Sequence, residues 1–207
     1  MTHPPFIVYG LPRSRTYWLS HFLSYGDTKC YHEACMYMRS IDDMRSFLSQ
    51  DNTGAAETAA APGWRLIHHY RPDIRAVVIR RPVKDVVKSL LAVDMSGVAR
   101  YDVALAHKSM SYLDRYLDQI EANVPGAVSV RFDDLADQET CRRVFEHCLP
   151  YRFDAAWWEA FAPINLQINS RAMMRYRFAH RPQIDAFKAQ CWAELRKLAK
   201  SGAFPHE

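Results

Sequence analysis

Short runs of consecutive apolar residues alternate along the chain with segments whose apolar residues recur every three or four positions. The apolar runs are typical of strands, and the spaced residues are typical of helices that bury one face. The predicted strands are Phe6–Tyr9, Thr28–Tyr31, Trp64–Ile67, Ile74–Ile79 and Ala127–Val130. The fourth carries Ala76-Val-Val-Ile79, the continuous apolar run expected of a strand that is buried on both faces.

Helical spacing is found between and after these runs. The predicted helices run from the turn before Trp18 to about Tyr25, over Ile41–Leu48, from Pro82 to Leu91, from Asp102 to Ile120, around Val144–Leu149, over Trp157–Phe161 and over Ile184–Leu198. We expect Asp133 or Asp134 to cap the fifth of these helices, and we expect Gln50–Gly63, an Ala-rich polar segment, to be a surface loop. Strands that alternate with helices predict an α/β fold, with a mostly parallel sheet covered on both faces, in one domain spanning residues 1–207.

Composition excludes several function classes. A chain of 207 residues that is 49% hydrophobic and 24% charged is typical of a soluble protein, and no window approaches the roughly 20 apolar residues of a membrane span. The N-terminus lacks the pattern of a secretion signal, so we expect a cytoplasmic protein without membrane contact. A net charge of +4 is too small to indicate nucleic-acid binding. Five cysteines without a C-x-x-C pair favour free thiols and no metal site.

The first strand leads into the segment Gly10-Leu-Pro-Arg-Ser-Arg-Thr-Tyr-Trp-Leu19. A tight turn between a strand and a helix presents backbone N–H groups to an anion, and the arginines beside it favour a polyanion. The segment is not the phosphate loop of ATP-binding enzymes, because Arg15, Thr16 and Tyr17 stand where that motif requires Gly, Lys and a hydroxyl residue.

This segment resembles the 5′-phosphosulfate loop of the sulfotransferase family, close to G-x-P-[RK]-S-G-T-T-x-L. A second feature also resembles that family: an Arg at a strand end followed by a Ser eight residues later, here Arg81 and Ser89, with Arg80 as the alternative Arg. The resemblance implies a P-loop-NTPase-like three-layer sandwich and binding of 3′-phosphoadenosine 5′-phosphosulfate. Such a donor carries anions at both ends and therefore needs two cationic sites.

By the same resemblance, Arg13, Ser14, Thr16 and Tyr17 would hold the phosphosulfate, and Arg80 or Arg81 with Ser89 would hold the 3′-phosphate. Arg13 would stabilise the departing charge electrostatically. Trp18 either stacks on the adenine or lies in the core. Arg15 replaces the usual Gly, so the loop cannot rely on a left-handed glycine there, and we expect the guanidinium to reach a phosphate oxygen instead.

Sulfuryl transfer needs a base for the acceptor hydroxyl. Glu33 follows Arg13 at about the distance found for the catalytic Glu of some family members, whereas His69, or His68, precedes Arg80 as the catalytic His of others does. We place Glu33 slightly ahead, with His32 able to orient it.

These patterns predict a metal-independent sulfotransferase that acts on a hydroxyl of a small molecule or carbohydrate. The alternatives are a P-loop-like nucleotide kinase and a non-catalytic nucleotide-binding module. The acceptor pocket is expected to be built from loops such as Gln50–Gly63 and Ala92–Tyr101. Trp157 and Trp158 either line that pocket or pack in the core, and the basic stretch Arg171–Arg181 is either a lid over the donor or a solvated segment.

Overall fold

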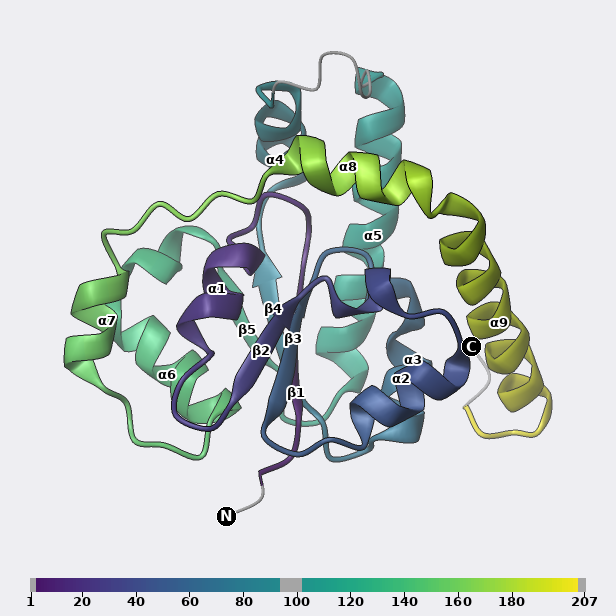
Figure 1. Cartoon of the computed structure of the whole chain (residues 1–207), viewed down its shortest axis with the longest axis horizontal. Helices are drawn as coiled ribbons and strands as arrows, with labels where there is room; N and C mark the ends of the chain where they lie inside the picture. The colour runs from purple at the N-terminus through teal and green to yellow at the C-terminus, as the bar shows by residue number, and fades with distance from the viewer. Residues whose placement is uncertain (1–2, 94–101, 205–207) are drawn as a thin grey trace.

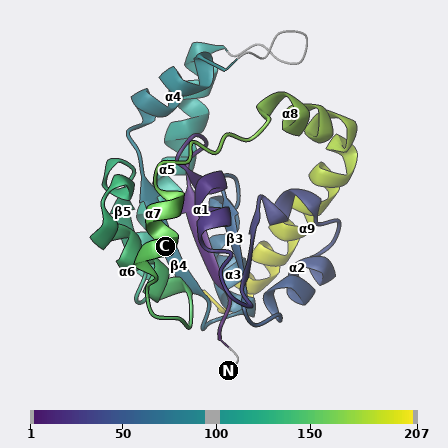
Figure 2. The same cartoon turned by 60° about the vertical axis from the view of Figure 1, so that its left-hand side comes forward.

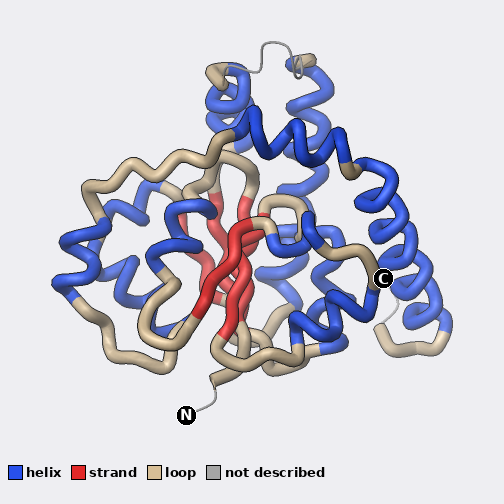
Figure 3. Tube along the Cα trace, viewed as in Figure 1, coloured by secondary structure: helices blue, strands red, loops and turns tan. Residues whose placement is uncertain are grey.

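A parallel sheet in the order β2-β3-β1-β4-β5 forms the centre of the molecule (Figure 3). The computed structural model of the chain describes residues 3–93 and 102–204. The strands are β1 (Phe6–Gly10), β2 (Lys29–His32), β3 (Thr53–Glu57), β4 (Arg75–Arg80) and β5 (Val128–Arg131). Because all of these strands are parallel, their carboxyl ends lie along one edge of the sheet.

Helices cover both faces of the sheet (Figures 1 and 2). They are α1 (Thr16–Phe22), α2 (Ile41–Leu48), α3 (Trp64–Tyr70), α4 (Val83–Leu91), α5 (Val103–Asn123), α6 (Gln138–Cys148), α7 (Ala155–Phe161), α8 (Ser170–Ala179) and α9 (Arg181–Lys200), with short 3₁₀ helices at Ala34–Tyr37, Ala61–Gly63 and Asp133–Ala136. In Figure 1, α1, α6 and α7 lie on one side of the sheet, and α2, α3, α5 and α9 lie on the other. The predicted α/β three-layer fold is confirmed.

The alternation of side chains along β1 divides the core into two clusters. Phe6 and Val8 pack on the face covered by α1 and α6, together with Phe22 and Phe145. Ile7 and Tyr9 face the opposite cluster, which includes residues from α2, α3, α5 and α9. Successive residues of a strand point to opposite faces, so one buried strand supplies both layers.

Two sequence-based assignments are wrong. The segment Gln50–Gly63 contains β3, a buried strand that pairs with both β1 and β2. Trp64–Ile67 begins helix α3 instead of forming a strand, and it buries Trp64, Leu66 and Ile67. The other predicted strands and helices are present, with shifts of one to a few residues at their ends.

The cap expected at Asp133 or Asp134 is also wrong. Both residues lie in a 3₁₀ helix, and Asp137 caps α6 by accepting a hydrogen bond from the Thr140 backbone nitrogen at 2.8 Å. Most of the loop expected at Ala92–Tyr101, residues 94–101, lies outside the described residues.

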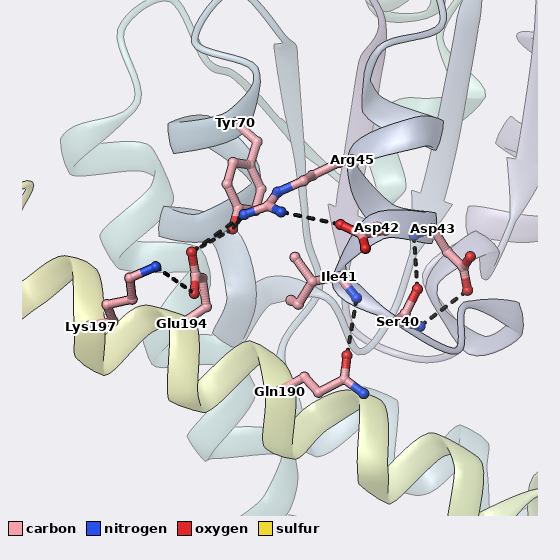
Figure 4. A network of polar contacts seen from close by, with 9 residues as sticks. All are labelled: Ser40, Ile41, Asp42, Asp43, Arg45, Tyr70, Gln190, Glu194 and Lys197. Carbon is pink, nitrogen blue, oxygen red and sulfur yellow. Dashed lines mark hydrogen bonds and ion pairs between the residues drawn. The ribbon is translucent and has the colours of Figure 1, made fainter.

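Polar contacts hold the C-terminal helix α9 against α2 and α3 (Figure 4). The Gln190 amide oxygen accepts a bond from the Ile41 backbone nitrogen at 3.2 Å, at the first turn of α2. The Tyr70 hydroxyl donates to Glu194 at 3.0 Å and accepts from Arg45 at 2.8 Å. Exposed ion pairs contribute little stability on their own. These contacts fix the position of α9, while its buried Ile184 and Phe187 supply the apolar packing.

Among the helices of the described residues, none is both long and apolar enough to cross a membrane.

Candidate functional site

The carboxyl ends of β1, β2, β3 and β4 bring most of the sequence-predicted site residues to one edge of the sheet. Gly10 of β1 is in register with Ile79 of β4, and Tyr9 is in register with Glu57 of β3. The loop after β1 therefore lies between two groups of side chains: Arg81 and Ser89 follow β4, and Glu33 and Glu57 lie at the ends of β2 and β3.

Arg13 connects the loop after β1 to the segment that follows β4. Its Nε donates a hydrogen bond to Ser89 Oγ at 3.1 Å, and its Nη2 donates to Gln167 Oε1 at 3.1 Å. The Arg81 guanidinium donates to the backbone carbonyl of Arg13 and lies 4.0 Å from the ring centroid of Phe132. Burial, as the main cause, and the charge of Arg13 lower the pKa of Arg81. Arg81 is thus bound to the backbone of the loop that carries Arg13, and both arginines bring positive charge to this part of the site.

Arg80 points elsewhere. It forms ion pairs with three acidic side chains of α5, at 3.3 Å to Asp114, 2.6 Å to Asp118 and 3.8 Å to Glu121. Of the two arginines that the sequence left open, Arg81 is the one that contacts Arg13, through the backbone carbonyl of Arg13.

A cavity of about 380 Å³ lies beside this pair. Its lining comes from the start of α4 and from the segment after β5: Arg81, Pro82, Asp85, Lys88, Ser89, Ala92, Phe132 and Asp133. Arg81, Lys88 and Ser89 give this cavity two cations and a hydroxyl, which are suitable ligands for a phosphate, while Asp85 and Asp133 in the same lining offset part of the positive charge.

The loop after β1 has left-handed backbone at residue 15, where the related loop usually has Gly. Arg15 has φ of 61°, and Arg13 has φ of 68°. Arg15 adopts the conformation that Gly would favour, and its Nη1 donates a hydrogen bond to the Leu135 carbonyl at 3.1 Å. Left-handed backbone costs a non-glycine residue roughly 1–2 kcal/mol. Glu33 also has positive φ, at 55°. Strained conformations of this kind cluster at functional sites.

The other loop residues have different surroundings. The Ser14 hydroxyl is buried and has no hydrogen-bond partner within the described part of the chain, so it retains capacity for a ligand. Thr16 Oγ1 lies 3.2 Å from His32 Nε2, and the ring of Tyr17 packs edge-on against that of His32. Trp18 is 3% exposed and stacks on Phe22, which favours the core alternative for this residue.

A larger cavity of about 850 Å³ opens on the other side of the loop, between the sheet edge and helices α3, α5, α8 and α9. Pro12 of the loop lines it, as do Glu33, Glu57 and Thr58. The cavity therefore joins the ends of β2 and β3 to the loop that carries Arg13.

Glu33 lies in a polar environment at the inner end of this cavity. Its Oε1 accepts hydrogen bonds from the Thr58 backbone nitrogen at 3.1 Å and from the Thr58 hydroxyl at 2.5 Å. Burial raises the pKa of Glu33, while the Thr58 bonds and the charge of Arg177 act in the opposite direction. Both bonds that Glu33 accepts from described residues fall on Oε1, so Oε2 has capacity for another hydrogen.

Glu57 is the functional candidate that the sequence analysis missed. It is 1% exposed; its Oε1 accepts a bond from the Cys35 backbone nitrogen at 3.0 Å, and its Oε2 has no partner among the described residues. Burial, followed by the charge of Glu33, raises the pKa of Glu57 to about 8. At neutral pH this favours a proton on Glu57.

The histidines divide into two groups. Burial lowers the pKa of His32 to about 4, so its ring is neutral at pH 7 and lies between Thr16 and Glu33, 3.9 Å from Glu33 Oε1. His68 and His69 belong to α3 instead of a connection between two strands. His68 packs near Tyr9 and Trp64, and His69 is exposed beside Phe204; neither is among the residues that line the two cavities.

The remaining candidates flank the site. The basic stretch 171–181 contains α8, whose Arg177 lines the larger cavity. Trp157 packs against Phe161 and donates to the Phe22 carbonyl at 3.0 Å, on the opposite side of the sheet from that cavity. Among the described residues, no three His, Cys, Asp or Glu side chains gather as metal ligands, and all five cysteines are free thiols.

The fold is similar to a solved structure of a sulfotransferase domain from the curacin biosynthetic pathway. The TM-score is 0.56 over 100% of both chains, and 11% of the aligned residues are identical. No protein-family model and no curated protein matches the sequence. At this identity the similarity shows a sulfotransferase-like fold.

Proposed function

We propose that this protein is an enzyme that transfers a sulfuryl group from 3′-phosphoadenosine 5′-phosphosulfate to a hydroxyl group. The observation that supports this most is that Arg13 is hydrogen-bonded to both Arg81 and Ser89 at the loop after β1. The larger cavity, which has two glutamates at its inner end, lies next to this loop. The sulfotransferase-like fold is in agreement with it.

The donor would bring two anionic groups, and the residues present suit both. Arg13 and the unpartnered Ser14 hydroxyl would bind the 5′-phosphosulfate. Arg81 and Ser89, which line the smaller cavity, would bind the 3′-phosphate. Arg80 forms ion pairs with three carboxylates of α5, and this supports the choice of Arg81 for the role.

Glu33 would accept the proton of the acceptor hydroxyl. In the transfer, the acceptor oxygen bonds to sulfur as the bond from sulfur to the nucleotide phosphate breaks, and the proton moves to Glu33. Glu33 is assigned this role because it lines the larger cavity and both hydrogen bonds it accepts from described residues fall on Oε1, whereas the raised pKa of Glu57 favours a proton on that carboxyl at neutral pH. Neutral His32, between Thr16 and Glu33, would position the carboxylate relative to the loop.

Calorimetric titration with adenosine 3′,5′-bisphosphate, and separately with ATP with and without Mg²⁺, tests the donor site. We expect preferential, metal-independent binding of the bisphosphate. Arg81→Ala should weaken that binding by on the order of 10- to 100-fold, about 1.5 to 3 kcal/mol. Arg80→Ala is the matched control and should leave the affinity within about twofold. Preferential binding of Mg²⁺–ATP, or equal losses in the two variants, would contradict the proposal.

A further inference from the structure

The larger cavity has a polar inner end and an apolar middle. Glu33, Glu57 and Thr58 form the inner end, beside Pro12 of the loop. The wall beyond them is built mainly from aliphatic, methionine and aromatic side chains of α2, α3, α5 and α9: Met44, Leu66, Ile67, Met110, Leu113, Ile184, Phe187 and Leu195. A sugar presents hydroxyl groups on every side and would leave them unpaired against such a wall. An aliphatic or aromatic body would bury apolar surface there.

The mouth of the cavity exposes apolar side chains. Leu105 is 62% exposed, Tyr112 41% and Trp192 40%, and all three are among the lining residues. Leu105 and Tyr112 are seven residues apart on α5 and share one face of that helix, while Trp192 comes from α9. Large apolar residues gathered on a surface mark a binding site.

Cations surround these apolar residues. Lys108 and Arg115 of α5 and Lys188 of α9 are exposed and line the same cavity. Lys108 and Arg115 are also seven residues apart, so they lie on one side of α5. Among the described lining residues, the acidic side chains are Glu33 and Glu57, both at the inner end. The mouth is therefore positively charged, and it favours an anionic group at the outer end of a bound molecule.

We propose that the acceptor is an anionic amphiphile: a molecule whose hydroxyl lies at Glu33, whose apolar body fills the cavity between α5 and α9, and whose anionic group lies at Lys108, Arg115 and Lys188. This inference rests on the proposed sulfuryl transfer and names its acceptor class. Of the small molecules and carbohydrates that the sequence left open, it selects a small molecule with an apolar body.

Calorimetry with model acceptors tests the inference, on protein first titrated to saturation with adenosine 3′,5′-bisphosphate. The probes are 12-hydroxydodecanoate, the neutral dodecane-1,12-diol and glucose, all below their aggregation limits. We expect 12-hydroxydodecanoate to bind at least tenfold more tightly than the diol, and glucose to give no measurable binding. Equal affinities for the acid and the diol, or glucose binding as tight as that of the acid, would overturn the proposal.

Variants locate the anionic group. The double variant Lys108→Gln/Lys188→Gln should lose the tenfold preference for the acid over the diol, while Lys29→Gln, an exposed lysine at the start of β2, should keep it. Ser109→Trp, at a partly exposed position of the cavity wall, should block both probes and leave bisphosphate binding unchanged. A double variant that retains the full preference would refute the placement.

The bisphosphate titration separates the two proposals. If the bisphosphate binds and the acid shows no preference, the acceptor class is wrong and the proposed function stands. If the acid binds with its tenfold preference but the bisphosphate does not bind, sulfuryl transfer is wrong, and the cavity is a site for anionic amphiphiles without that role.

Discussion

The buried carboxyl of Glu57 should make the stability of the fold fall with rising pH. Burial and the charge of Glu33 raise its pKa from 4.5 to about 8. A carboxyl whose folded pKa lies above its unfolded value binds a proton more strongly in the folded state. Its contribution to stability is therefore complete below pH 4.5 and is lost as the pH rises toward about 8.

From about pH 6.5 to 8 the Glu57 carboxyl loses its proton in the folded protein, and Glu33, whose pKa burial also raises, acts in the same direction. Burial lowers the pKa values of His32 and His68 from 6.5 to about 4, so they give stability above pH 6.5 that is lost as the pH falls toward 4. These two histidines therefore have little effect on how the free energy of unfolding changes with pH above pH 6.5. One proton released on unfolding gives a slope of up to about 1.4 kcal/mol per pH unit. Allowing for partial ionisation near pH 8, the free energy of unfolding should fall by roughly 1.5 kcal/mol across the window.

Urea unfolding, followed by tryptophan fluorescence at several pH values in this window, measures the fall. Glu57→Gln removes the titrating group, keeps the size of the side chain and should make the profile nearly flat. Glu159→Gln, an exposed position on α7, is the matched control and should keep the slope of the unsubstituted protein. A wild-type profile that rises or stays level, or an equal fall in both variants, would refute the reasoning.

Three further substitutions test the site and the sheet. Glu33→Gln should lower turnover by about 10²-fold or more with donor affinity nearly unchanged, measured by initial rates and calorimetry; near-normal turnover would remove Glu33 as the base. In urea unfolding, Arg15→Gly should have a free energy of unfolding about 1 kcal/mol higher than that of Arg15→Ala, because only Gly adopts the left-handed backbone without strain. Equal free energies for the two variants would contradict that strain. Gly54→Ala should destabilise the fold by about 1 to 3 kcal/mol, because an added Cβ would lie 2.1 Å from the Phe6 ring. Gly63→Ala, where an added Cβ has nothing within 4 Å, is the control and should destabilise the fold far less. Similar losses of stability in thermal unfolding of the two variants would count against this packing.

The sequence predicts the strands with strong apolar runs and misses the strand that completes the site. β1 and β4 each contain a run of four consecutive apolar residues, which supplies both faces and is evident from the sequence. β3 reads Thr-Gly-Ala-Ala-Glu, in which every residue after the Thr has low strand preference. Gly54 is needed there because the ring of Phe6 occupies the space beside it. The small residues that look like a loop are required by close packing in the centre of the sheet.

The same error hides Glu57. Glu33 follows a predicted strand and is recognisable from its distance to Arg13, whereas Glu57 lies in the segment assigned to a surface loop. The alternation of Thr53, Ala55 and Glu57 on one side of a short strand was the available signal, and it is weak without large side chains.

Likewise, nothing in the local sequence distinguishes Arg81 from Arg80. Their difference comes from acidic residues of α5 that lie more than 30 residues further along the chain.

The central place of β1 also determines when the site can form. β1 is the first strand to leave the ribosome, yet its neighbours β3 and β4 are synthesised much later, and both of its edges stay unpaired until then. Parallel pairing over such separations is a slow step in folding. The cationic side of the site depends on β1 pairing with β4, and the carboxylate side depends on β1 pairing with β3. Pairing of β1 with β3 and β4 therefore creates both sides of the site. During refolding, nucleotide binding should return no faster than the native tryptophan fluorescence.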